Sequence, residues 1–218
     1  MDWKASGLPW VDHLAGAAGY GDWRQRCDTA PTPCDRRPQL DASAAVRLGA
    51  FVLLSGVLIL GFWKVVRHGP THALPRLIAF EAILGLVLAN APNWFATPLA
   101  ARQVASWVLL AGSLLLALHG FSLLRMHGGT TGGIETTTVI VRRGAYRFIR
   151  HPLYLSLMLF AVGAYLKSPG WPAGALLGIA VAGLLVTAYV EERENESRFG
   201  ERYREYMRET KKFVPFVF

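Results

Sequence analysis

Long apolar runs separated by polar, often basic segments dominate the chain after its first 40 residues. Five of these runs predict membrane helices, at 44–66, 74–90, 103–124, 152–167 and 171–190. A helix needs about 20 apolar residues to cross the bilayer core, and the first, third and fifth runs approach that length. The second run is short and contains Glu81, and the fourth is short and ends at Ser168-Pro169-Gly170. Either of these two helices is expected to tilt or to span incompletely.

Composition supports the same class of protein. The 218 residues are 52% hydrophobic and only 17% charged, a balance that is unusual for a soluble domain. The polar first 40 residues contain no apolar stretch of the kind that makes a cleavable signal peptide. The predicted fold is an all-α integral membrane protein with about five transmembrane helices and a C-terminal amphipathic helix. Residues 1–42 are predicted to form an extracytoplasmic lead, and residues 43–218 the membrane domain.

Basic residues predict the orientation of these helices. Lys and Arg gather in segments 64–76, 125–150 and 193–212, whereas the opposite loops hold only Arg102 and Lys167. By the positive-inside rule, the basic segments and the C-terminus face the cytoplasm and the N-terminus lies outside, in an inner or plasma membrane. The net charge of +8 suits anionic lipid headgroups. Nucleic-acid binding would need a soluble module with a basic face, and the sequence predicts no such module.

The N-terminal lead is rich in aromatic residues, among them Trp3, Trp10 and Trp23. This density next to a membrane favours an interfacial anchor, with a cap over the outer face as the alternative. The two cysteines of the chain, Cys27 and Cys34, both lie in this lead. Outside the cytoplasm a disulfide between them and two free thiols are equally compatible with the sequence. The sequence has no histidine pair close to these two cysteines, so it does not predict a metal site there.

Polar and aromatic residues gather where the fourth apolar run begins. Pro152 is well placed at a first helical position, which makes His151 the N-cap. The N–H groups of such a helix start, together with Arg150, suit a carboxylate or a phosphate. Tyr146 and Tyr154 add hydroxyl groups and aromatic faces. The alternative is ordinary anchoring at the membrane interface, where Arg and Tyr are also typical.

Two carboxylates, Glu191 and Glu192, stand where the fifth run ends. Carboxylates at a membrane edge are costly unless they are solvated, paired or bound to a cationic ligand. The helix is predicted to continue through 192–210 as an amphipathic segment, with Phe199 and Tyr203 on one face. The aromatic face suits either stacking on an adenine or contact with the membrane.

Glu81 lies inside the second run. Intramembrane carboxylates are usually functional, so Glu81 is a candidate substrate contact or proton carrier. The alternatives are an ion pair with Arg76 about one turn away, or a carboxyl group that is hydrogen-bonded within the helix bundle.

A glycine-rich segment from Gly128 to Gly133 is followed by the β-branched run Thr136–Val141. Such residues favour extended backbone. Two interpretations remain open: an extended strand beside a cofactor, or a simple connector.

Taken in order, these motifs resemble the isoprenylcysteine carboxyl methyltransferase family and its relatives, the phospholipid methyltransferases. The resemblance covers about 137–217. It consists of Gly-x-Tyr-Arg-x-x-Arg-His-Pro-x-Tyr from Gly144, Glu191-Glu192 after a helical hairpin, Phe-Gly-x-x-Tyr-x-x-Tyr from Phe199, and a terminal Phe-x-Pro from Phe213. The residues before about 130 share only a pattern of hydropathy.

The resemblance implies S-adenosylmethionine as cofactor, bound by residues 130–218 on the cytoplasmic side, and an apolar methyl acceptor in the membrane. The candidate catalytic residues are Glu81, which could act as a base toward an amine acceptor, and Glu192. In-line methyl transfer requires no metal. Matched by position, the implied cofactor-binding residues are Thr138, Val139, Ile140, Val141, Tyr146, His151, Pro152, Leu153, Tyr154 and Glu191. Arg150, as a partner for an anion, and Tyr203, on the aromatic face, are candidates from the residues themselves.

One departure concerns the acceptor. Eukaryotic isoprenylcysteine enzymes carry an arginine about one turn before the acidic pair, where it orients the substrate carboxylate. Here that turn reads Thr187-Ala188-Tyr189-Val190. The acceptor is therefore left open between a lipid, a prenylated thiol or carboxylate, and another small apolar molecule. Oligomeric state is also open.

Two other functions remain as alternatives. The Arg-His-Pro-x-Tyr segment and the tyrosine-rich tail also resemble sterol reductases, which would use NADPH held by arginines such as Arg142 and Arg143. A non-catalytic membrane scaffold, with every motif acting as an interface anchor, is the third possibility.

Overall fold

The computed structural model describes residues 42–68, 72–129 and 138–214, with side chains described up to Trp63 in the first helix. By its internal contacts, Val46–Phe218 forms one unit. The predicted N-terminal lead, with Cys27 and Cys34, lies outside the described residues.

The regular structure of the described residues is helical, which confirms the predicted all-α fold. Four helices, α3, α4, α5 and α7, are long and apolar enough to cross a membrane, and α6 is a shorter apolar helix. With 14 residues, α6 is about 21 Å long, less than the ~30 Å hydrocarbon core. The helices are α3 (Ala42–His68), α4 (Ala73–Asn90), α5 (Ala101–His127), α6 (Pro152–Tyr165), α7 (Trp171–Phe199) and α8 (Glu201–Glu209), with 3₁₀ turns η1 (Ala91–Asn93) and η3 (Gly144–Arg147).

Two helix ends follow from the local sequence. Pro152 is the first residue of α6 and His151 is its N-cap, as predicted, because proline lacks the N–H that would be unpaired there. The chain leaves α7 at Gly200, whose φ of +60° is accessible to glycine without strain. The prediction of one uninterrupted helix over 192–210 is therefore wrong, since the turn at Gly200 separates α7 from α8.

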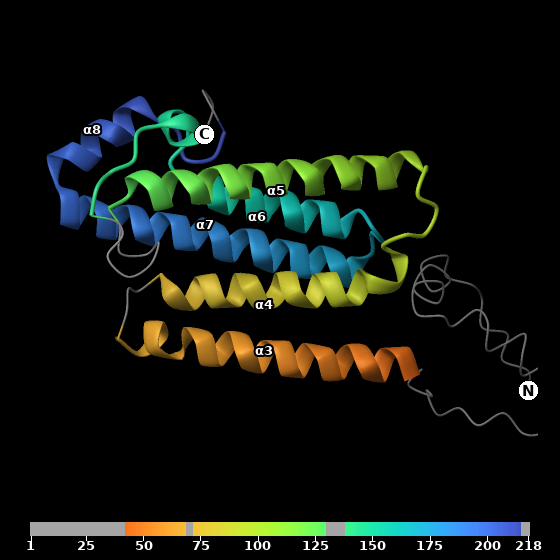
Figure 1. The fold of residues 1–218 in the computed structure, drawn as a ribbon. Helices are drawn as coiled ribbons and strands as arrows, with labels where there is room; N and C mark the ends of the chain where they lie inside the picture. The colour runs from red at the N-terminus through yellow and green to blue at the C-terminus, as the bar shows by residue number, and fades with distance from the viewer. Residues whose placement is uncertain (1–41, 69–71, 130–137, 215–218) are drawn as a thin grey trace, which may run out of the picture. The chain divides into compact units, whose positions relative to one another are not determined.

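Small residues form the core between α4, α6 and α7. Lipid tails are as apolar as leucine, so close van der Waals contact rather than hydrophobic burial favours helix association in a membrane. Alanine, the smallest side chain with a Cβ, makes up most of this core. Helix α5 packs in turn on α6, and α4 on α7, as Figure 1 shows. The core residues are Ala79, Ala82, Ile83, Leu86, Ala161, Ala164, Ala173, Ala180 and Leu184.

A buried polar cluster joins the loops at the far end of α6. Lys167 is fully buried, and its Nζ donates to Gln103 Oε1 at 3.1 Å while lying 3.5 Å from the ring centre of Trp107. Gln103 Nε2 donates to the Asn93 carbonyl at 3.1 Å. These contacts offset the desolvation of the ammonium group. The loops after α4 and α6 are thereby held against the start of α5.

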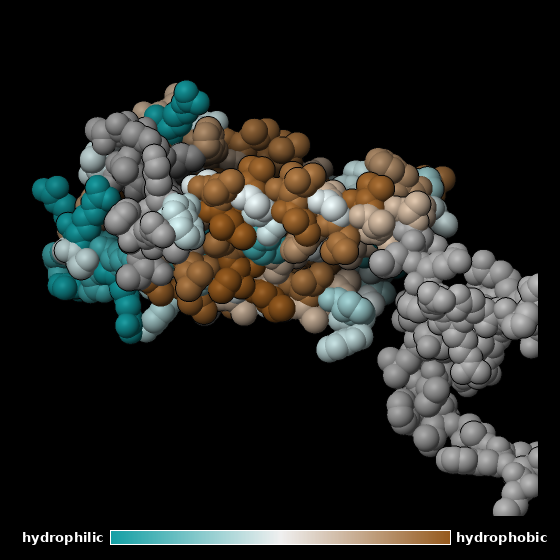
Figure 2. Space-filling view, turned by 90° about the horizontal axis from the view of Figure 1, so that it is seen from below, coloured by the Kyte–Doolittle hydropathy of each residue, from teal (hydrophilic) through white to brown (hydrophobic). Residues whose placement is uncertain are grey.

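Helix α3 is the least buried of the long helices, since no residue of its most apolar stretch is fully buried in the described chain. Its exposed side chains include Val52, Leu53 and Leu60. Figure 2 shows hydrophobic side chains over this side of the molecule and hydrophilic ones gathered at the end that carries α8. A continuous apolar surface of this kind suits contact with lipid.

The described parts of the basic segments predicted for the cytoplasm lie at one end of the helices. The end of α5, the start of α6, the end of α7 and α8 are all found there (Figure 1). Which side of the membrane this end faces stays a prediction.

A substitution at Gly183 tests the close packing of α7 on α4. A Cβ at this position would lie 2.9 Å from the Pro75 carbonyl oxygen and 3.0 Å from the Ala79 Cβ. We expect Gly183→Ala to lower the free energy of unfolding by about 1–3 kcal/mol, seen as a lower thermal unfolding temperature in detergent. Gly178→Ala is the matched control on the same helix, because nothing lies within 4 Å of its Cβ. Equal stability of the two variants would contradict the close packing.

Candidate functional site

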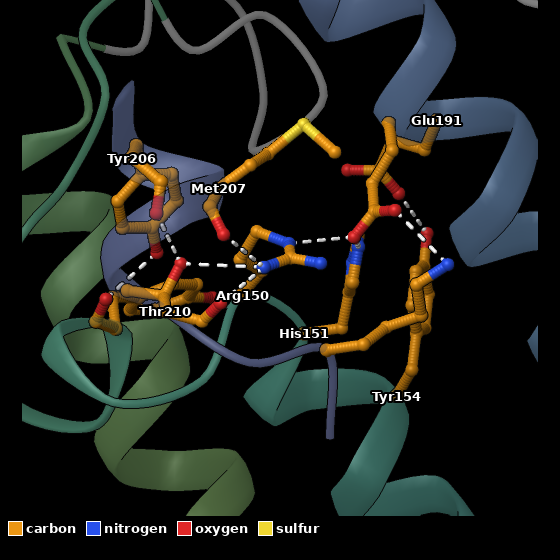
Figure 3. A network of polar contacts seen from close by, with 10 residues as sticks. Arg150, His151, Tyr154, Glu191, Tyr206, Met207 and Thr210 are labelled. Carbon is orange, nitrogen blue, oxygen red and sulfur yellow. Dashed lines mark hydrogen bonds and ion pairs between the residues drawn. The ribbon is translucent and has the colours of Figure 1, made fainter. Parts of the chain in front are cut away.

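Residues from four separate segments meet at the end of the helices that carries α8. They come from the loop before α6, the first turn of α6, the end of α7 and the segment after α8. Figure 3 shows Arg150, His151, Tyr154 and Glu191 at this end, with the hydroxyl of Tyr154 directed toward Glu191. We call this group the Glu192 cluster; it comprises Arg150, His151, Tyr154, Glu191, Glu192 and Lys212.

Glu192 lies at the centre of the cluster. Its Oε1 accepts from Arg150 Nε at 2.7 Å and lies 3.2 Å from His151 Nε2, and its Oε2 is 3.0 Å from Lys212 Nζ. Only 5% of Glu192 is exposed. A buried carboxylate is stable where cationic partners and hydrogen bonds replace water. Glu192 has three such partners, and through them it joins α7 to the start of α6 and to the tail.

The segment after α8 is also attached through its backbone. The Arg150 N–H donates to the Lys211 carbonyl at 2.8 Å, and the Lys211 N–H donates to the Phe148 carbonyl at 3.0 Å. The guanidinium of Arg150 donates in addition to the carbonyls of Met207 and Thr210. Arg150 is therefore held by both its main chain and its side chain (Figure 3).

Glu191 is placed differently from its neighbour. Within the described part of the chain, its hydrogen-bond partner is the hydroxyl of Tyr154, at 2.5 Å. The Tyr154 ring stacks on His151, with ring centres 5.4 Å apart, and His151 packs in turn against Phe213 at 5.8 Å. Glu191 is partly exposed. Because a carboxylate offers about four lone-pair sites, Glu191 retains capacity to accept a further donor.

Three buried tyrosines hold α8 against the loop before α6. The Tyr206 hydroxyl donates to the Tyr146 carbonyl at 2.7 Å, and the ring of Tyr203 packs edge-on against Tyr206. Burial raises the pKa of all three hydroxyls above that of free tyrosine, so they remain protonated donors at neutral pH. Tyr203 is buried rather than displayed at the surface, and its stacking on an adenine stays a prediction.

The stretch predicted to line a cofactor, Thr138–Val141, forms no strand in the described residues. The Thr138 N–H donates to the Gly128 carbonyl at 2.9 Å. Thr138 and Val139 are exposed, whereas Val141 is buried. The role of this backbone in binding stays a prediction.

Glu81 lies apart from the Glu192 cluster. Its Oε2 accepts from Ser55 Oγ of α3 at 2.7 Å, which is one of the arrangements that the sequence allowed. Arg76, on the same helix, lies over the ring of Phe62 at 5.3 Å from its centre. The structure therefore brings five of the predicted side chains together in the cluster and places Glu81 elsewhere. Those five are Arg150, His151, Tyr154, Glu191 and Glu192.

The sequence did not point to Lys212 or Thr210 as parts of this site. Both belong to the basic, polar tail, and basic residues at that position are typical of a cytoplasmic helix end. Lys212 directly precedes Phe213 of the terminal motif, but nothing in that spacing indicates contact with Glu192. Only the pairing of the tail with the loop before α6 brings them together.

The fold and the cluster define a helical protein with membrane-spanning helices and a charged, hydrogen-bonded site at one end of them. No family model matches the chain. One relative is methanethiol S-methyltransferase 1 of Bradyrhizobium diazoefficiens, which is 31% identical over 125 residues. The match covers 55% of this chain and 42% of the relative, so the chain spans less than half the length of that protein.

Glu192→Gln tests whether this carboxylate holds the site together. The change leaves Arg150 and Lys212 without their buried counter-charge, and we expect the free energy of unfolding to fall by about 3–5 kcal/mol. Cleavage of the tail by a protease should also become faster. The matched control is Glu196→Gln, whose exposed partner is Arg204, and we expect it to change little. A Glu192→Gln protein as stable as the control would refute the structural role.

Proposed function

We propose that this protein is an integral membrane methyltransferase that uses S-adenosylmethionine and acts on a small apolar acceptor. The observation that carries the proposal is the difference in pairing and exposure between two adjacent carboxylates, Glu191 and Glu192. Glu192 is occupied by three basic groups, whereas Glu191 is partly exposed and accepts one tyrosine hydroxyl. Glu191 is thus the carboxylate with capacity for the ammonium group of a ligand.

The charged and hydrogen-bonding groups of this site match the charged groups of S-adenosylmethionine. S-adenosylmethionine supplies an activated methyl group on a sulfonium, and it also carries an ammonium, a carboxylate and an adenine. We assign the ammonium to Glu191. We assign the carboxylate to the first turn of α6, where Leu153 and Tyr154 have N–H groups without an intrahelical partner. Stacked His151 and Tyr154 would shield the site from water.

In this proposal Glu192 is a positioning residue rather than a proton acceptor. Its carboxylate is buried and paired, and it fixes Arg150, His151 and Lys212 around the place where the cofactor would bind. Because the protein would contribute alignment and exclusion of water, a rigid frame of this kind is what in-line methyl transfer requires.

The acceptor is proposed to be a thiol. The relative reported above is named for transfer to methanethiol. Thiols are more acidic than alcohols, with a pKa of about 8.5 for the cysteine side chain. A thiol acceptor is therefore easier to deprotonate than an alcohol, and we propose that no dedicated base is needed. The basic groups of Arg150 and Lys212 would favour the thiolate electrostatically. We propose that the acceptor reaches the site from the membrane and that the site faces the cytoplasm, as the positive-inside rule predicts.

Calorimetric titration with S-adenosylhomocysteine tests the cofactor assignment. The purified protein in detergent should bind it saturably, and Glu191→Gln should weaken binding at least about tenfold, because a charge-assisted hydrogen bond is lost. Glu196→Gln, one turn further along α7 and paired with Arg204 instead of with the cluster, should bind like the wild type. Unchanged affinity in Glu191→Gln would refute the site assignment.

A second titration, with NADPH, distinguishes a methyltransferase from a reductase. Binding of NADPH but not of S-adenosylhomocysteine would indicate that the protein is a reductase. Binding of neither ligand by a folded sample would favour a scaffold. If S-adenosylhomocysteine binds, transfer of a labelled methyl group to short-chain thiols, compared with lipid acceptors, tests the thiol proposal.

A further inference from the structure

A cleft separate from the Glu192 cluster opens between α3, α4 and α7. Its volume is about 450 Å³, within the ~300–1,000 Å³ range of small-molecule pockets. Nearly all of its lining is apolar, and none of the lining residues is basic. The side chains that matter below are Phe51, Ser55, Ile78, Glu81, Leu176 and Ile179.

One carboxyl group lies in this apolar cleft, deep among the spanning helices. Ser55 is the central residue of the 27-residue helix α3, about 20 Å from either end. Its Oγ donates to Glu81 Oε2 at 2.7 Å. Water and lipid headgroups are remote from this depth, so the polar requirements of Glu81 must be met by protein or by a ligand.

The second oxygen of Glu81 is buried, and in the described part of the chain it has no hydrogen-bond partner. Leaving a buried acceptor unpaired is unfavourable, more so for a charged group. The donor found among the described residues, Ser55, is used on the other oxygen. The cleft therefore combines space, apolar walls and a lining carboxylate, one oxygen of which has no partner among the described residues.

From this we infer that the cleft is a binding site for a small apolar amine, which donates an N–H to the carboxylate of Glu81. Charge complementarity selects the amine, because an ammonium supplies both the missing donor and the counter-charge that the lining lacks. The apolar part of the ligand packs against residues such as Phe51 and Leu176. An amine reaches this depth because its neutral form partitions into the bilayer.

The helix arrangement allows entry from the lipid side. Helix α3 meets α4 at a few points, among them the edge-on contact of Phe62 with Phe80, whose ring centres are 5.6 Å apart. The lining residues Ile78 and Ile179 are about half exposed, so the cleft is open at the apolar surface. No residue of the Glu192 cluster lines it. The inference therefore stands independently of the proposed methyltransferase function.

The test is a binding titration of the full-length protein in lipid nanodiscs with 4-phenylbutylamine, with empty nanodiscs subtracted. The alcohol 4-phenylbutanol is the matched probe of nearly the same size and no charge. We expect saturable binding of the amine, at least about tenfold tighter than that of the alcohol. Equal affinity for the two probes, or no saturable binding of the amine by folded protein, would overturn the inference.

Two variants complete the test. Glu81→Gln keeps the size of the side chain and removes its charge, and it should weaken amine binding at least about tenfold while leaving alcohol binding unchanged. Ile179→Trp fills the cleft from an exposed position, so it should fold normally and block both probes. Unaltered amine binding in Ile179→Trp would place the ligand elsewhere and refute the site, even if Glu81→Gln failed to fold.

Discussion

The site at the α8 end depends on one buried ion cluster, in which the carboxylate of Glu192 is bound by Arg150, His151 and Lys212. These groups come from three parts of the chain, and their attraction is strong because the cluster is largely shielded from water. Removing the carboxylate would leave the basic groups close together without a counter-charge. The positions of the first turn of α6, the end of α7 and the tail therefore depend on this contact.

The same physical constraint explains how the helices associate. In a bilayer, burial of apolar side chains gives little preference for protein over lipid. The structure instead uses close contact at alanines and glycines between α4, α6 and α7, and polar clusters at both ends of the helices. At one end Lys167 is held by Gln103 and Trp107. At the other end lies the Glu192 cluster.

The two glutamates at the end of α7 show how neighbours in sequence acquire different roles. Glu192 is turned toward basic groups and buried, while Glu191 is directed to Tyr154 and partly exposed. One carboxylate stabilises the frame, and the other has capacity for a ligand. Glu81 is a third case, since its surroundings are apolar and its partner is a single serine hydroxyl. The same side chain thus supports a structural contact, a proposed cofactor contact and a proposed amine site.

The sequence by itself determined the membrane helices and several of their ends, because long apolar runs and proline act locally, as the start of α6 at Pro152 shows. It also placed the motif residues Arg150, His151, Tyr154 and Glu191 in one candidate site. It missed the turn at Gly200, which divides the predicted terminal helix, and it gave no indication of Lys212 or Thr210. Only the tertiary structure decided which carboxylate is paired and that Glu81 lies apart. These features depend on contacts between segments far apart in the chain, whose side-chain directions no local pattern of residues encodes.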